Sequence, residues 1–271
     1  MTSLDTRSAM RVDTVSYCPS RDIGNNLAKA MIDPHQKATP EKIMRYFNSR
    51  AFRREQPSDP QLMLQIISDA IAMHTPIQFV LYWGKGQRCT INGHDIECLD
   101  FLASFATRVR ENFEPGANIK LIFTDTHAEL NGYSPLGIRR YFGDVRICAL
   151  KHGFDSCWLS ELTRIAEPVV GPIDGELPQE LAGRLVASAK KWYRGEGTAE
   201  DGARKYYRLN MLELRAVELA YPRSIFVTYN SPDFRALCPR RLPVFYMYTL
   251  RRGCRIKPWF LPAPTRPMDA P

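Results

Sequence analysis

The chain has 271 residues and a net charge of +8, and its 44% hydrophobic and 24% charged residues are typical of a globular protein, not a disordered one. It holds no apolar run of about 18 residues, and its charged N-terminus lacks the apolar segment of a signal peptide, so neither membrane insertion nor secretion is expected. The seven cysteines form no C-x-x-C pair and predict reduced thiols, not a disulfide frame or a structural zinc site. We therefore expect a cytoplasmic protein without a metal or a cofactor.

The first half of the chain predicts helices, followed by strands that alternate with helices. Residues 1–21 show no periodicity and predict a flexible arm. Three amphipathic helices are expected next, at 23–32, 40–48 and 60–74. They are followed by a buried strand at 77–83, a helix at 99–113, a strand at 118–124 and a helix at 135–141. Residues 145–150 fit either a helix or a strand, and 157–159 fit a short strand.

The second half begins with a connector at 167–178 that is rich in Pro and Gly. Helices are expected at 179–193 and 199–221, and strands at 224–229, 244–250 and 256–260. Strands that alternate with helices over short joins predict a parallel sheet with crossover helices. We expect one α/β catalytic domain over 22–262, with an N-terminal helical cap and a Pro-rich tail at 263–271.

Ligands of open α/β sheets bind beyond the carboxyl ends of the strands, which directs attention to the residues after the first strand. There Tyr82 and Trp83 could stack on a ring, two glycines allow close backbone approach, and Lys85 could neutralise an anion. The segment matches neither a Walker loop nor G-x-G-x-x-G. The alternative is a tight polar turn with Trp83 in the core.

Several polar residues also follow the second strand. If the segment is extended, Asp125, His127 and Glu129 point the same way, and Asn131 comes next. Such a cluster could bind an ammonium or guanidinium group, or do acid-base chemistry through His127. A metal would need a fourth ligand that the sequence does not offer. The structural alternative is a capping network around a loop.

The helix expected at 199–221 has two contrasting stripes, at about 100° per residue. One stripe holds Arg204, Arg208 and Arg215, and the opposite stripe holds Tyr206, Asn210 and Glu213. If the arginines face solvent, Glu213 faces inward, where an unpaired carboxylate is costly. Glu213 is then either half of a buried ion pair or the proton acceptor of a pocket, with Tyr206 as an orienting hydroxyl and Asn210 beside the substrate.

Basic residues gather on the two helices at 179–193 and 199–221. The candidate contacts to tRNA phosphates are Lys190, Lys191, Arg204, Lys205 and Arg208. A second basic stretch, 235–257, carries seven basic residues interleaved with aromatics and no acid. The alternative is a solvated basic face without a partner.

The segments Tyr82–Gly86, Thr124–Tyr133 and Lys257–Phe260 resemble the arginine-containing cyclodipeptide synthases of fungal secondary metabolism. The resemblance covers about residues 60–262 and implies a Rossmann-like domain. It also implies that arginyl-tRNA and a second charged tRNA are consumed and a diketopiperazine is released. The bacterial cyclodipeptide synthases have a nucleophilic serine after the first strand, where this chain has Tyr82-Trp83-Gly84, and their Tyr-x-x-x-Glu pair is not matched.

A second resemblance is to the isonitrile synthases of tyrosine and tryptophan. It rests on the order of strand, helix and Thr-Asp loop over 77–133, and on the late strand and Pro-Trp over 224–259. It implies an enzyme that acts on a free amino acid and a sugar phosphate, without nucleic acid. A third interpretation is a non-catalytic RNA-binding module. The first hypothesis from the sequence is aminoacyl-tRNA-dependent cyclodipeptide formation, with no membrane and no obligate protein partner.

Overall fold

The computed structural model describes most of the chain between residues 39 and 255. The described residues are 39–84, 90–171, 173, 176–230 and 232–247, with the backbone alone at 250–251 and 254–255. Outside these residues lie Lys85, the helix expected at 23–32, the strand expected at 256–260, and the expected arm and tail.

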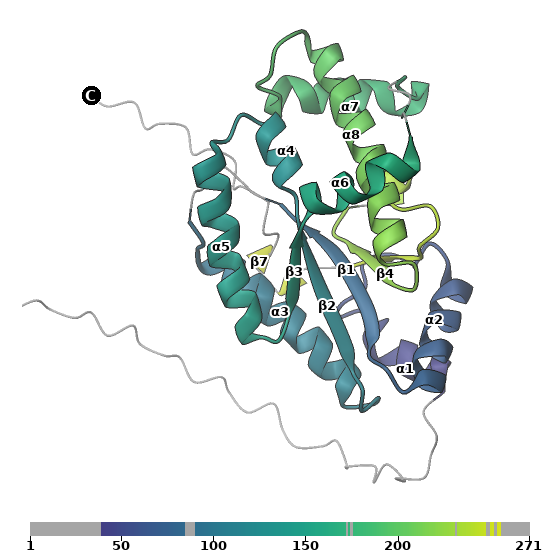
Figure 1. The fold of residues 1–271 in the computed structure, drawn as a ribbon. Coiled ribbons are helices and arrows are strands. Elements are labelled where there is room, and N and C mark those ends of the chain that lie inside the picture. The colour runs from purple at the N-terminus through teal and green to yellow at the C-terminus, as the bar shows by residue number, and fades with distance from the viewer. Residues whose placement is uncertain are drawn as a thin grey trace, which may run out of the picture. The chain divides into compact units, whose positions relative to one another are not determined.

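Five parallel strands form the centre of the fold (Figure 1). They are β1 Ile77–Trp83, β2 Ala117–Phe123, β3 Asp155–Trp158, β4 Ile225–Thr228 and β5 Val244–Tyr246. Their order across the sheet is β3-β2-β1-β4-β5, and each neighbouring pair is parallel. A separate antiparallel pair is formed by β6 Leu250–Arg251 and β7 Cys254–Arg255. The predicted α/β architecture, a Rossmann-like parallel sheet with crossover helices, is confirmed.

The helices of the described residues lie on both faces of this sheet. They are α1 Pro40–Phe47, α2 Pro60–Met73, α3 Gly93–Arg110, α4 Asp125–Leu130, α5 Pro135–Lys151, α6 Leu159–Val170, α7 Gln179–Trp192, α8 Ala199–Ala220 and the short 3₁₀ helix η1 Pro232–Leu237. No helix among them is both long enough and apolar enough to cross a bilayer.

Local sequence signals start several of these helices. Thr39, Asp59 and Ser134 each accept a backbone N–H of the first turn, and each is followed by a proline at the first helical position. The side chains of Thr198 and Asp201 form a capping box at the start of α8. These caps explain why the starts of α1, α2, α5 and α8 were predicted correctly.

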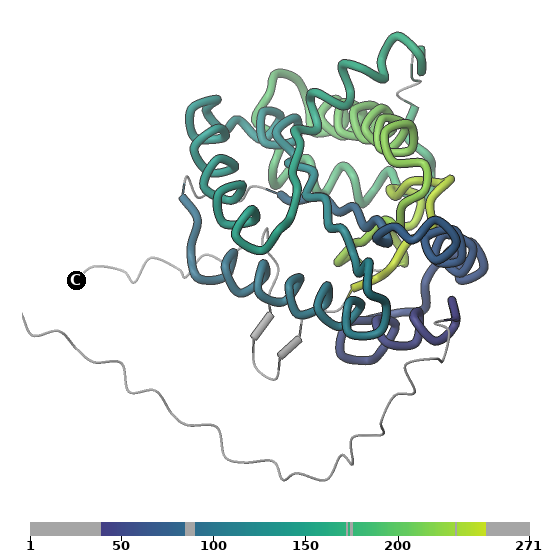
Figure 2. Tube along the Cα trace, turned by 60° about the horizontal axis from the view of Figure 1, so that its bottom comes forward, coloured from purple at the N-terminus to yellow at the C-terminus, as the bar shows by residue number. Residues whose placement is uncertain are grey.

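Alternate residues of β1 face two different apolar cores. Phe79, Leu81 and Trp83 pack with residues of α1, α2, α3 and α5. Val80 and Tyr82 pack on the other face with residues of α6 and α8. Both views show α3 and α8 on opposite sides of the sheet (Figures 1 and 2). A strand buried on both faces explains the continuous apolar run from which it was predicted.

The segment after β2 differs from the prediction. Residues 125–130 form the helix α4, so side chains turn by about 100° per residue and do not alternate between two faces. The expectation that Asp125, His127 and Glu129 share one face was therefore wrong.

Three other helices also differ from their predicted extents. The helix expected at 99–113 begins at Gly93, because Asn92 and Asp95 form a capping box that the apolar pattern alone did not reveal. The helix expected at 135–141 continues to Lys151, which makes residues 145–150 helical. The helix α6 was missed, because Pro168 in its last turn made the region resemble a connector.

The strand order defines where a ligand can bind. From β1 the chain passes through α3 to β2 and through α5 to β3, and then returns through α6, α7 and α8 to β4 on the other side of β1. The connections from the two halves thus diverge between β1 and β4. In open α/β sheets this switch point, beyond the carboxyl ends of the strands, is the usual position of the ligand.

Candidate active site

A cavity of about 470 Å³ lies at this switch point. Its walls come from the ends of β1 and β4, from α4 and the loop after it, and from α7, α8 and η1. Its polar lining includes Tyr82, His127, Asn131, Tyr206, Asn210 and Thr228. A groove of about 500 Å³ between α6 and α8 lies away from the strand ends, so we place the candidate site in the cavity.

A buried glutamate holds the histidine that lines the cavity. Glu213 of α8 has no exposed surface, and its two carboxylate oxygens bind two neighbouring side chains of α4. Oε1 accepts the hydroxyl hydrogen bond of Thr126 at 2.5 Å, and Oε2 lies 2.6 Å from Nε2 of His127. The His127 side chain is 31% exposed, so the imidazole stands between the carboxylate and the cavity.

The environment of His127 favours its protonated form. Burial alone would lower the pKa of His127, but the charge of Glu213 and its hydrogen bond raise it, and the net effect is a pKa above the ordinary value of 6.5. In the neutral ring, Glu213 accepts the Nε2 proton, which leaves the lone pair on Nδ1. A histidine oriented by a carboxylate can accept a proton and be stabilised as an imidazolium.

This geometry changes the expected role of Glu213. The helical wheel placed Glu213 inward and the arginine stripe outward, and in the structure Glu213 is buried while Arg204, Arg208 and Arg215 are exposed. Glu213 does not itself line the cavity, and its partner is a histidine, not an arginine. The residue of this pair that lines the cavity is therefore His127, and Glu213 holds it from the buried side.

Tyr206 and Asn131 are also brought to the cavity wall. The Tyr206 hydroxyl donates a hydrogen bond to Oδ1 of Asn131, which joins α8 to the residue after α4. Burial raises the pKa of Tyr206 to about 12, so the phenol stays protonated near neutral pH. Its ring lies 6.1 Å from that of His127, centroid to centroid.

Three of the predicted substrate-binding residues do not line the cavity. Trp83 is fully buried, and its indole N–H donates to the Tyr141 hydroxyl at 3.2 Å. Asp125 is buried and accepts the backbone N–H of Ser160 at 3.1 Å, which makes it a structural anchor for α6. Glu129 is exposed on the outer side of α4. The alternatives of a core tryptophan for Trp83 and a capping role for Asp125 are therefore the better descriptions, and Glu129 is a surface residue.

Other residues of the site were not singled out by sequence reasoning. Thr126 binds Glu213, and Thr228, Trp192 and Tyr207 line the cavity. Thr228 could have been found from its place near the end of a predicted strand, next to the switch point. Thr126 could not, because its partner lies 87 residues away in the sequence.

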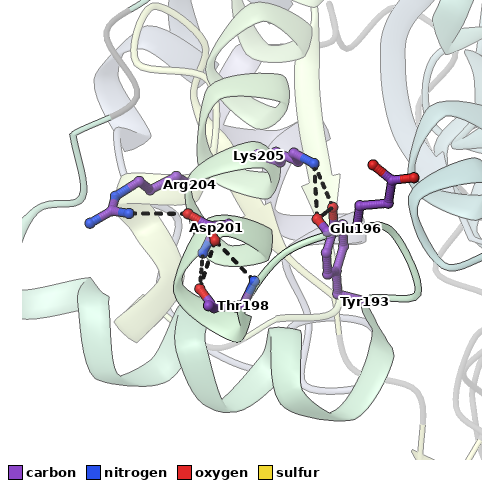
Figure 3. A network of polar contacts seen from close by, with 6 residues as sticks. All are labelled: Tyr193, Glu196, Thr198, Asp201, Arg204 and Lys205. Atoms are coloured by element: carbon purple, nitrogen blue, oxygen red, sulfur yellow. Dashed lines mark hydrogen bonds and ion pairs between the residues drawn. The ribbon is translucent and has the colours of Figure 1, made fainter.

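The five candidate tRNA contacts are all exposed on α7 and α8. Two of them have partners at the joint between these helices (Figure 3). Arg204 pairs with Asp201 at 3.4 Å, and Lys205 donates to the Tyr193 hydroxyl at 2.7 Å and to the Glu196 carbonyl. For Lys190, Lys191 and Arg208 no such ion pair is seen in the described part of the chain. Binding of tRNA remains a prediction.

Among the described residues, no three His, Cys, Asp or Glu side chains come together in a way that could hold a metal ion.

The cysteine thiols near the cavity are not activated as nucleophiles. Burial raises the pKa of Cys238 to about 11, and burial also raises the pKa of Cys157. These cysteines are therefore protonated near neutral pH and are poor nucleophiles.

Comparisons with known proteins give a likeness that concerns the fold. No protein-family model matches the chain, and no curated protein matches its sequence. The chain is similar in structure to the PvcA protein of Pseudomonas aeruginosa, with a TM-score of 0.57 and 16% sequence identity. The likeness covers 75% of this chain and 83% of PvcA. At this identity it shows that the two proteins share the architecture of the parallel sheet and its helices.

Proposed function

We propose that the chain is an enzyme that acts on a free amino acid bound in the cavity at the switch point. The observation that carries the proposal is the His127–Glu213 pair, a histidine held by a buried carboxylate at the wall of that cavity. Of the two families that the sequence resembles, the likeness to PvcA agrees better with the isonitrile synthases than with the cyclodipeptide synthases.

The size and lining of the cavity favour a small, uncharged and aromatic side chain. A volume of about 470 Å³ lies within the range of small-molecule sites. Among the described residues of the lining there is no Lys, Arg, Asp or Glu. Aromatic rings form much of the wall, from Tyr82, Tyr133, Trp192, Tyr206 and Tyr207. A guanidinium group would find no carboxylate there, which argues against arginine as the substrate.

In the mechanism that we propose, His127 moves a proton to or from the amino acid. The neutral ring presents Nδ1 as the base, and Glu213 stabilises the imidazolium that forms. Thr126 holds the other carboxylate oxygen and so fixes the direction of the pair. Because these groups are already oriented, the proton transfer avoids the reorganisation of the surrounding dipoles that it requires in water.

A substrate screen tests the proposal. Purified protein treated with ribonuclease is incubated with the twenty free amino acids, with and without a mixture of pentose phosphates, and each amino acid is followed by mass spectrometry. We expect an aromatic amino acid to be consumed without RNA. The control is the Glu213→Gln variant, in which consumption should fall sharply. If no free amino acid is consumed under any of these conditions, the proposal is wrong.

A second candidate function, the use of aminoacyl-tRNA, is favoured by the basic face of α7 and α8. These helices supply both the cavity wall and the exposed Lys190, Lys191 and Arg208. A charged tRNA could lay its phosphates on this face while its amino acid enters the cavity. Product that forms only from a charged-tRNA mixture, and that ribonuclease abolishes, would favour this candidate over the first.

A further inference from the structure

Among the described residues, two polar atoms of the cavity wall are buried without a hydrogen-bond partner. They are the Tyr82 hydroxyl oxygen and Oδ1 of Asn210. Both residues line the cavity, Tyr82 near the end of β1 and Asn210 one turn before Glu213 on α8. Buried polar atoms are nearly always hydrogen-bonded, so two that face the same cavity point to a ligand group that completes them.

The chemistry of these atoms restricts what that group can be. The amide oxygen of Asn210 can only accept a hydrogen bond, so the ligand must donate one. The Tyr82 hydroxyl can accept another. Burial and then the negative charge of Glu213 raise the pKa of Tyr82 well above its ordinary value, so the phenol stays protonated near neutral pH. A site with two such acceptors, and without Lys or Arg in its described lining, suits a ligand group that donates several hydrogen bonds.

We propose that the Tyr82 hydroxyl and Asn210 Oδ1 bind the α-amino group of the substrate. An ammonium carries three N–H donors, and these two atoms can accept two of them. This inference rests on the proposed function, because it assumes that an amino acid occupies the cavity. It makes Tyr82 and Asn210 the residues that distinguish an amino acid from its deaminated analogue.

Pairs of probes that differ only in the amino group test this inference. The probes are L-tyrosine with 3-(4-hydroxyphenyl)propionate and L-tryptophan with 3-indolepropionate, and the dissociation constants are measured by isothermal titration calorimetry. The full-length chain is compared with Tyr82→Phe and Asn210→Leu. Each variant should raise the dissociation constant of the amino acid about 10-fold or more, which is the effect of losing one hydrogen bond to a charged group. The dissociation constant of the deaminated probe should change less than about 3-fold.

Controls separate recognition from loss of structure. Tyr82→Phe removes only an oxygen that has no partner in the described part of the chain, and should keep the melting temperature. Its binding data can therefore be interpreted even if Asn210→Leu folds poorly. Tyr221→Phe removes a hydroxyl that binds Cys157 outside the cavity, and it should leave the preference for the amine unchanged.

The outcomes distinguish this inference from the proposed function. If no amino acid binds to the wild-type chain, the proposed function fails, and the inference fails with it. If the amino acids bind but Tyr82→Phe weakens both members of a pair equally, or neither, the inference alone is wrong. A loss of affinity confined to the amino acids in both variants supports it.

Discussion

At the scale of single residues, the candidate site depends on one charge that is paired inside the protein. Glu213 is buried, and its charge is compatible with burial because Thr126 and His127 bind both of its oxygens. The inward position of Glu213 could be predicted from the helical wheel, because α8 has a clear arginine stripe. Its partner could not be predicted, because His127 lies 86 residues away and α4 was expected to be extended.

The paired charge predicts how stability depends on pH. The pKa of His127 in the folded protein is raised above 6.5. The pair therefore contributes its full stabilisation of the folded state below that pH, and this stabilisation is lost as the pH rises through the raised pKa. Glu213→Gln should therefore lower the free energy of unfolding by about 3 kcal/mol at pH 6 and by clearly less at pH 9. Urea unfolding of both proteins across this range measures the difference.

A second buried glutamate of α8 provides the matched control. Glu218 pairs with Arg215 at 3.6 Å and accepts the backbone N–H of Arg241. Since arginine keeps its charge throughout this range, the effect of Glu218→Gln should not change between pH 6 and 9. If the loss of stability caused by Glu213→Gln also stays the same between pH 6 and 9, the assigned pairing of Glu213 with a titrating histidine is contradicted.

At the scale of elements, the cavity depends on short segments whose local signals are weak. The strong signals, such as the caps before Pro40, Pro60 and Pro135, predicted their helices well. The helix α6 was missed although Leu159, Thr163 and Ala166 form a buried stripe, because the Pro168 signal dominated the local pattern. The helix α4 has six residues, too few for a periodicity that distinguishes it from an extended segment.

The turn after α4 gives a prediction about how this element is held. Gly132 lies between two residues of the cavity wall, with φ of +74°, and a Cβ there would meet Cβ of Arg194 at 2.7 Å. Gly132→Ala should therefore lower the free energy of unfolding by about 1–2 kcal/mol because of the backbone conformation, and by about 1–3 kcal/mol more because of the clash. Gly153 has the same φ and open space around it, so Gly153→Ala should show only the first cost.

Urea unfolding of the two glycine variants separates these costs. We expect Gly132→Ala to be the less stable variant and to bind the amino acid more weakly, because the segment at Arg194, which follows α7, would be pushed away from the turn beside the cavity. Equal stabilities would mean that Arg194 does not pack tightly on this turn.

At the scale of the whole molecule, the order of the strands places the site. Local patterns predicted the alternation of strands and helices, and hence the parallel sheet. They could not predict that β4 returns beside β1, because that pairing joins Phe79 to Ile225 across the long segment that holds α6, α7 and α8. This order creates the switch point and brings α8 over the end of β1.

The net charge of +8 gives a prediction at the same scale. If the exposed face of α7 and α8 binds tRNA, Lys190→Glu with Arg208→Glu should weaken tRNA binding and reduce the salt slope of log K by about 1 for each phosphate that is no longer bound. Arg146→Glu with Lys151→Glu, on α5, makes the same change in net charge and should have a smaller effect. Filter binding at several salt concentrations measures both. Equally weakened binding in the two double variants would mean that the net charge alone attracts RNA.

The most direct test of the account is the turnover of the amino acid identified in the screen by the His127→Gln variant. Wild type and variant are compared under identical, RNA-free conditions, with melting temperatures measured alongside. The control is His152→Gln, because His152 stacks on Phe154 and pairs with Asp100 away from the cavity. We predict a loss of about 100-fold or more for His127→Gln, as is usual for a general acid or base, and almost none for His152→Gln. Turnover by folded His127→Gln at the wild-type rate would contradict the account.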